Sequence, residues 1–136
     1  MEIAIKNCQD KIPINPKRLK AAILKLLLKE GINSAEITVL FTTAARIRKL
    51  NRRYHRRDCA TDVLAFDLGS RKEKNIFADI VVSADAAIRN AKIYQTTESY
   101  ELYLYVLHGL LHLTGYDDRT AKQRRIMEHK VNEILR

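Results

Sequence analysis

The stretch LYLYVLHGLLHLTGYDD, residues 102–118, decides the fold of this chain. Its first twelve residues form the longest apolar run, and such a run predicts a buried helix over residues 98–114. Thr97 or Thr96 can cap the start of this helix. Gly115 predicts its end, because glycine readily adopts the left-handed conformation that stops a helix. The other elements must therefore cover a central apolar helix.

Four short strands and four further helices are expected around it. Apolar alternation and β-branched content predict strands over 2–6, 36–42, 63–68 and 77–83. Helical spacing of apolar residues predicts helices over 16–30, 43–53, 84–94 and 119–135. The sequence therefore predicts a single α+β domain over residues 1–136, with about five helices and one sheet of about four strands in two layers.

Three details of this assignment depend on local composition. The charged run NRRYHRRDCAT, residues 51–61, predicts a loop, and GSRKEKN, residues 69–75, predicts a turn. Asn15 and Ser83 are expected to cap the helices that follow them. The inner face of the last helix is expected to consist of Ile126, Val131, Ile134 and Leu135.

The charge balance favours a polyanionic partner. Lysine and arginine number 25 against 16 acidic residues, which gives a formal net charge of +9. RNA, DNA or an anionic membrane surface would suit this excess, and a solvated basic surface is the alternative. The two cysteines, Cys8 and Cys59, are too few for a disulfide framework and predict free thiols in a reducing compartment such as the cytoplasm. No signal peptide and no run of about 20 apolar residues is present, so no membrane association is expected.

The histidines of the central stretch have the spacing of metal ligands. His108 and His112 are four residues apart and lie on one helix face. Asp118 follows the glycine turn and can supply a third ligand, with Asp117 as its rival. Two imidazoles and a carboxylate with an open position suit catalytic zinc, although manganese or nickel would also accept this donor set. Gly109 stands where metalloproteases carry a general-base glutamate. The alternative is a pair of buried core histidines.

Several segments resemble the YbeY family of metal-dependent endoribonucleases. Residues 108–117 match its hallmark H-G-x-L-H-L-x-G-Y-D-H. The segment from Leu50 to Phe66 is similar to the family's LN..YR..D..TDVLSF block, and residues 79–83 are similar to its GDIVIS strand. Glu101 also falls where the family has an acidic residue. The resemblance covers most of the chain.

The resemblance implies an activity, a site and a fold. The implied activity is zinc-dependent, single-strand-specific RNA cleavage, acting in 16S ribosomal RNA 3′-end maturation and ribosome quality control. The implied partners are ribosomal RNA and the small ribosomal subunit, with no DNA. The implied metal ligands are His108, His112 and the residue at 118, on a helix packed against a mixed sheet.

Two positions depart from the family pattern. The third ligand is usually histidine, and here it is Asp118. A carboxylate lowers the net charge of the site by one unit and should make bound water less acidic. The family usually has arginine where this chain has His55. Either His55 acts as a proton carrier or Arg56 takes over that arginine's part in the chemistry, and both are candidate catalytic residues.

Two other functions compete with the nuclease. One is a non-catalytic, ribosome-associated RNA-binding factor whose metal is structural. The other is a small metalloprotease, which the glycine at position 109 disfavours. The loop RRYHRRD can also be no more than a solvated charge cluster.

Overall fold

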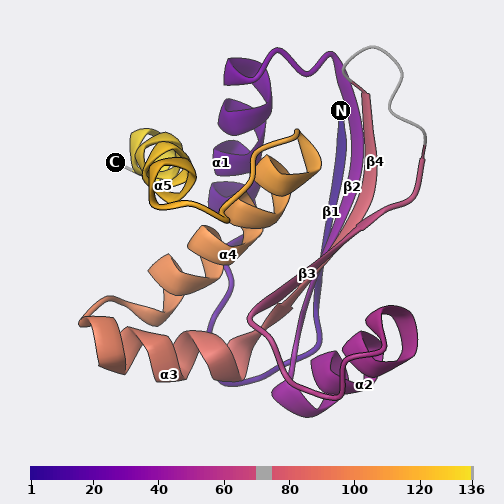
Figure 1. Ribbon diagram of the computed structural model, residues 1–136, viewed down its shortest axis with the longest axis vertical. Helices are drawn as coiled ribbons and strands as arrows, with labels where there is room; N and C mark the ends of the chain where they lie inside the picture. Colours follow the sequence, from indigo (N-terminus) through magenta and orange to yellow (C-terminus); the bar gives the residue numbers. More distant parts are fainter. Residues whose placement is uncertain (70–74, 136) are drawn as a thin grey trace.

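The chain folds around a four-stranded sheet in the order β1-β2-β4-β3 (Figure 1). The computed structural model describes residues 1–69 and 75–135. Strand β1 is parallel to β2, β2 is parallel to β4, and β3 is antiparallel to β4. The strands and helices in the described ranges are β1 (Glu2–Asn7), α1 (Pro16–Lys29), β2 (Ser34–Thr42), α2 (Ala44–His55), β3 (Val63–Asp67), β4 (Asn75–Ser83), α3 (Ala84–Tyr94), α4 (Glu98–Leu113) and α5 (Ala121–Leu135). The α+β class with one mixed sheet is confirmed.

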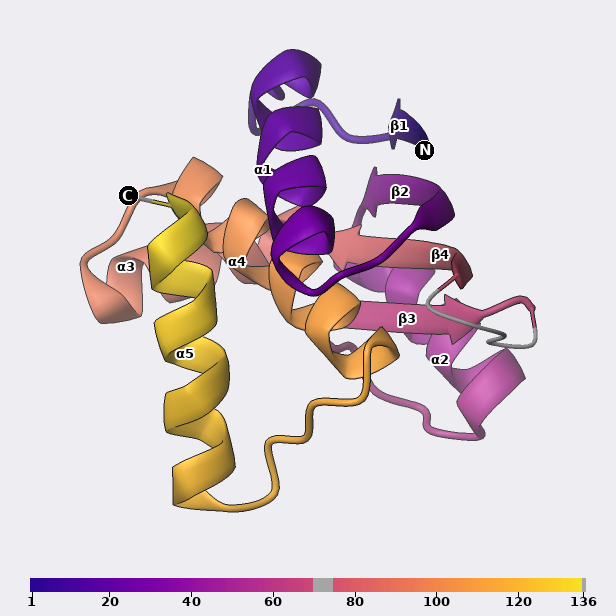
Figure 2. The same ribbon diagram turned by 90° about the horizontal axis from the view of Figure 1, so that it is seen from above.

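Helices cover the two faces of the sheet unequally. Helices α1, α3, α4 and α5 lie on one face and α2 lies on the other (Figures 1 and 2). Val63 and Ala65 of β3 pack into the large core on the α4 side, whereas Leu64 and Phe66 pack with Ile47 of α2. The expected two layers are therefore wrong: apolar side chains on both faces of β3 let α2 form a third, partial layer.

Helix α4 lies directly against the sheet, as the apolar stretch predicts. Nine of its 16 residues are buried, and the Thr97 hydroxyl caps it by accepting from the Tyr100 N–H at 3.0 Å. The close approach depends on Gly109. A β-carbon at this position would lie 3.4 Å from Ile80 and 3.5 Å from Val63, which is ordinary van der Waals contact. A methyl group therefore fits this space, and a longer side chain would have to displace Ile80 or Val63.

This packing predicts opposite responses at position 109. Gly109→Ala is expected to keep or raise the free energy of unfolding, by up to about 1 kcal/mol, since alanine favours the helix. Gly109→Leu is expected to lower it by about 1–3 kcal/mol, since the longer side chain overpacks the contact with β3 and β4. Urea unfolding of the two variants measures both effects. Equal stability of the leucine and alanine variants would contradict this packing.

Helix α2 is longer than the sequence predicts. It continues through His55, so the loop expected to begin at Asn51 is wrong over its first five residues. Asn51 is buried, and its side-chain amide donates to the Cys59 carbonyl at 3.0 Å. This bond ties the last turns of the helix to the segment that follows it, and Arg56, with a left-handed φ of 57°, ends the helix. Charge alone does not reveal such a bond.

The remaining sequence predictions have mixed outcomes. Asn15 and Ser83 cap α1 and α3 as expected. In α5, Ile126 is 42% exposed and does not belong to the inner face, whereas Met127 is buried. The buried stripe of α5 is Met127, Val131 and Ile134, which recur at one helical face, and Ile126 lies outside it. Most of the turn predicted for residues 69–75 lies outside the described residues.

Asp85 links three segments at the start of α3. Its carboxylate accepts from the Ala44 N–H at 2.7 Å, at the start of α2, and from Lys11 Nζ at 2.9 Å. The backbone hydrogen bond from Ala44 and the bond from Lys11 hold the pKa of Asp85 below its usual 3.8. The ionised carboxylate therefore stabilises the packing of α2 near α3.

The lowered pKa of Asp85 predicts a loss of stability in acid. Because the folded pKa lies below the unfolded one, the contribution is present above about pH 4 and is lost as the pH falls through the folded pKa. Asp85→Asn is expected to lower stability at pH 7 and to flatten its decline between about pH 5 and pH 2. Urea unfolding across this range tests the difference. Parallel pH profiles of variant and parent would contradict the linkage.

Candidate metal centre

The last turn of α4 and the connection to α5 bring His112 and Asp118 together. The helix ends at Thr114, and Gly115 adopts a φ of 109°. The Tyr116 N–H donates to the Leu111 carbonyl at 3.0 Å, which folds the chain back on the helix. The predicted glycine turn is thus present, and it returns Asp118 toward the helix.

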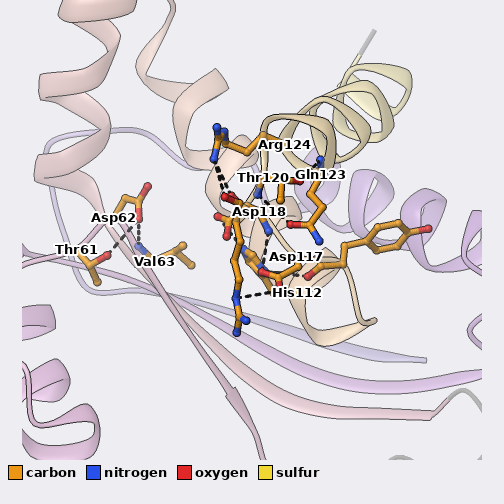
Figure 3. A network of polar contacts seen from close by, with 11 residues as sticks. Thr61, Asp62, Val63, His112, Asp117, Asp118, Thr120, Gln123 and Arg124 are labelled. Carbon is orange, nitrogen blue, oxygen red and sulfur yellow. Dashed lines mark hydrogen bonds and ion pairs between the residues drawn. The ribbon is translucent and has the colours of Figure 1, made fainter.

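His112 is oriented by the backbone. Its Nδ1 lies 3.1 Å from the carbonyl oxygen of Tyr116, and its Nε2 lies 3.5 Å from Oδ2 of Asp118 (Figure 3). When the neutral ring donates from Nδ1 to that carbonyl, the lone pair on Nε2 points toward Asp118. A backbone carbonyl holding one ring nitrogen is how metal-ligating histidines are usually oriented.

His108 lies one turn earlier, at the wall of a cavity of about 260 Å³ that Asp118 also lines. The other residues around this cavity are Tyr100, Leu104, Arg124, Met127 and Glu128. Burial lowers the pKa of His108, while the carboxylates of Asp62, Asp118 and Glu128 oppose this shift. A neutral imidazole is the form that binds a metal ion.

The donor set suits zinc, although the three side chains are not gathered into a closed shell. Over residues 1–69 and 75–135, no three His, Cys, Asp or Glu side chains form a group that could already hold a metal. His112 and Asp118 are 37% and 56% exposed, so both have room to rotate toward an ion beside His108. Two imidazoles and one carboxylate match the ligand types of catalytic zinc sites.

Asp117 has local partners of its own. One carboxylate oxygen accepts from the Asp118 N–H at 2.9 Å, and the other lies 3.2 Å from Arg119 Nε. Asp117 therefore shapes the turn, and Asp118 is the carboxylate that faces His112.

A capping box fixes the start of α5 beside this turn. The Gln123 N–H donates to the Thr120 hydroxyl at 3.1 Å, and the Thr120 N–H donates to the Gln123 amide oxygen at 3.0 Å (Figure 3). Arg124 donates to the Asp118 carbonyl at 3.1 Å. The pattern T-x-x-Q indicates this box in the sequence, although no cap was predicted here. These contacts hold the backbone of Asp118 in place.

Two carboxylates near His108 were also missed. Asp62 precedes β3, accepts from the Val63 N–H at 2.8 Å and acts electrostatically on His108. It belongs to the TDVL block, which could have pointed to it. Glu128 of α5 lines the cavity with His108. No local signal marks Glu128, because it is one charge among several on an amphipathic helix.

His55 is not brought to the histidines of α4. Its ring stacks on Phe66, with centroids 5.4 Å apart, and Phe66 packs on the α2 face of the sheet. The candidate proton carrier thus lies on the opposite face from His108 and His112. Arg56 caps the end of α2 and is exposed. The structure therefore groups His112 with Asp118 and His108, and places His55 and Arg56 elsewhere.

Comparison with curated proteins points to one family. The family model described as Endoribonuclease YbeY matches residues 4–136. A relative named Endoribonuclease YbeY from Syntrophus aciditrophicus is 33% identical over 99% of this chain and 88% of its own length. Another of that name, from Anaeromyxobacter dehalogenans, is 37% identical over 88% of this chain, but the match spans only 63% of the relative.

A solved structure has the same fold. The solution structure of TM1509 from Thermotoga maritima superposes with a TM-score of 0.67 and 27% sequence identity. The match covers 98% of this chain and 89% of that one. Together with the histidine motif on α4, these matches confirm the resemblance read from the sequence, and the chain belongs to the endoribonuclease YbeY family.

Proposed function

We propose that this chain is a zinc-dependent endoribonuclease that cleaves single-stranded RNA. The observation that carries the proposal is His112, held by the Tyr116 carbonyl so that Nε2 faces Asp118, one turn from His108. We place its action in ribosomal RNA maturation, including the 16S 3′ end, and in ribosome quality control, with the small ribosomal subunit as partner in the cytoplasm. Family membership supports the RNA substrate.

The proposed chemistry divides between the metal and the chain. A divalent ion, when bound, would supply Lewis acidity and lower the pKa of a water molecule. His108, His112 and Asp118 would hold it. The guanidinium of Arg124, at the same cavity, would attract the phosphate, and the carboxylate of Glu128 is placed to take up a proton. Arg56, on the end of α2, is proposed to contact RNA phosphate farther along the strand.

Three observations favour the nuclease over its competitors. Catalytic zinc sites keep one coordination position for water or substrate, and the exposure of His112 and Asp118 would let both reach an ion held there. In a metalloprotease, position 109 would carry the general base. Here position 109 is a glycine, which has no side chain to act as a base, and it lies against Ile80 and Val63. The net charge of +9 suits RNA.

Within the described part of the chain, no helix is long and apolar enough to cross a membrane.

Removal of the metal tests the proposal. Chelation is expected to lower cleavage of a single-stranded oligoribonucleotide at least about 100-fold, and added zinc is expected to restore it, because the ion activates the attacking water. The readout is product formation on a denaturing gel, with DNA of the same sequence as control substrate. Undiminished cleavage by metal-free protein would contradict the proposal, and stable ribosome binding without any cleavage would favour the non-catalytic factor.

A further inference from the structure

A second and larger cavity lies between α2 and the uncovered part of the sheet. Its volume is about 550 Å³, within the range of ligand sites. It is lined by Leu40, Arg46, Leu50, Tyr54, His55, Ala65, Phe66, Asp67, Leu68, Asp79 and Val81. It shares no lining residue with the cavity at His108. The metal site proposed on α4 therefore does not explain this second cavity.

Aromatic rings gather at one wall of this cavity. The His55 ring stacks on Phe66 at 5.4 Å with an interplanar angle of 29°, and Tyr54 meets Phe66 edge-on at 5.7 Å. Tyr54 is 58% exposed. Two exposed rings from α2, Tyr54 and His55, thus pack on the half-buried Phe66 of β3 beside the cavity. Proteins that bind single-stranded nucleic acid stack bases on such surfaces.

The charges around the cavity complement a nucleotide. Arg46 lines it. Helix α2 and the residues after it carry further basic side chains, of which Arg48, Lys49 and Arg52 lie around a separate cavity with Asp58. Arg48 is engaged by Asp58 at 2.8 Å, and Arg53 lies over the Tyr54 ring. On the sheet, the carboxylates of Asp67 and Asp79 line the cavity beside this one arginine. The Asp79 carboxylate can accept hydrogen bonds from amino groups of a base. A nucleic acid strand suits this surface, because its bases match the aromatic rings and the Asp79 carboxylate, and its phosphates match the basic side chains of α2.

We propose that this cavity binds one unstacked base of single-stranded RNA, with the adjoining phosphates along α2. The base packs against the exposed Tyr54 and His55 rings, which rest on Phe66, and its amino group meets Asp79. This site holds the strand at a second point, on the sheet face opposite the α4 histidines. The proposal rests on the proposed function for its ligand class, because the RNA is the strand to be cleaved.

Binding without cleavage tests the site. Fluorescence anisotropy with a short single-stranded oligoribonucleotide, in chelator, is expected to give a dissociation constant about tenfold higher for Tyr54→Ala and for His55→Ala. Tyr94→Ala is the matched control, because Tyr94 is 68% exposed in the last turn of α3 and lies outside both cavities. Thermal unfolding checks that each variant is folded. Equal dissociation constants for the Tyr54 and Tyr94 variants would overturn the proposal.

An abasic oligonucleotide shows whether a base occupies the cavity. Removing the bound base is expected to weaken binding to the parent about tenfold and to change binding to Tyr54→Ala much less, because the two changes remove one contact. Equal losses for parent and variant would overturn the base pocket. A free nucleoside monophosphate that binds as tightly as the oligonucleotide would overturn the RNA-strand assignment.

Kinetics separate this role of His55 from a catalytic one. If His55 stacks on a base, His55→Ala raises KM and leaves kcat close to that of the parent. A fall in kcat at unchanged KM would instead assign it to proton transfer and overturn its stacking role. Binding is measured without metal or cleavage, so a failed cleavage assay leaves the base pocket intact, and a failed binding assay leaves the metal site intact.

Discussion

His112→Ala is expected to lower RNA cleavage at least about 100-fold and to lower zinc affinity by a similar factor. The imidazole is the side chain that the Tyr116 carbonyl orients toward Asp118, so its loss removes a ligand that no neighbour replaces. Because the side chain is partly exposed and makes few packing contacts, the variant is expected to fold. Zinc titration with a competing chelator and single-turnover cleavage measure the two effects.

His129→Ala is the matched control for this change. His129 lies on α5, is more exposed than His112, and pairs with Glu133 at 2.7 Å. It faces neither Asp118 nor the cavity at His108, so the zinc affinity and cleavage rate of His129→Ala are expected to match those of the parent. Similar activity in the His112 and His129 variants would remove His112 from the site.

Asp118→Ala is expected to lower zinc affinity about 10- to 100-fold, because it removes the carboxylate that faces His112. Asp118→His restores a third ligand of the family type and is expected to keep the metal. Zinc affinity and cleavage, measured for both variants on the same oligoribonucleotide, give the comparison. The histidine variant is expected to reach its maximal rate at lower pH, since a neutral ligand leaves more positive charge on the ion.

Asp117 provides the comparison within the same turn. Asp117→Asn keeps an oxygen that can accept from the Asp118 N–H, and it removes the ion pair with Arg119. Its effect on zinc affinity is expected to be several-fold smaller than that of Asp118→Ala. The reverse order of effects would identify Asp117 as the third ligand.

The parts of the fold that the sequence predicts are those with local causes. The apolar run that forms α4, the caps at Asn15 and Ser83, and the turn at Gly115 depend on residues a few positions apart. The histidine pair follows from helix geometry alone. For the same reason, the return of Asp118 toward His112 could be expected from the glycine that precedes it.

The parts that escaped prediction depend on contacts that no short pattern reveals. Asn51, in the charged run, is buried and bonds to the Cys59 carbonyl eight residues on, and α2 covers the second face of the sheet because β3 is apolar on both sides. His55 thereby lies on the opposite face from α4, which no local pattern reveals. Glu128 reaches the cavity at His108 only through the packing of α5 beside α4.

X-ray absorption spectroscopy of the zinc-loaded protein tests the central claim most directly. The predicted result is one zinc ion per chain with two imidazole ligands and oxygen for the remainder, and one imidazole fewer in His112→Ala. Zinc bound through sulfur, zinc with no imidazole ligand, or failure to load stoichiometric zinc would contradict a metal centre built on His108, His112 and Asp118.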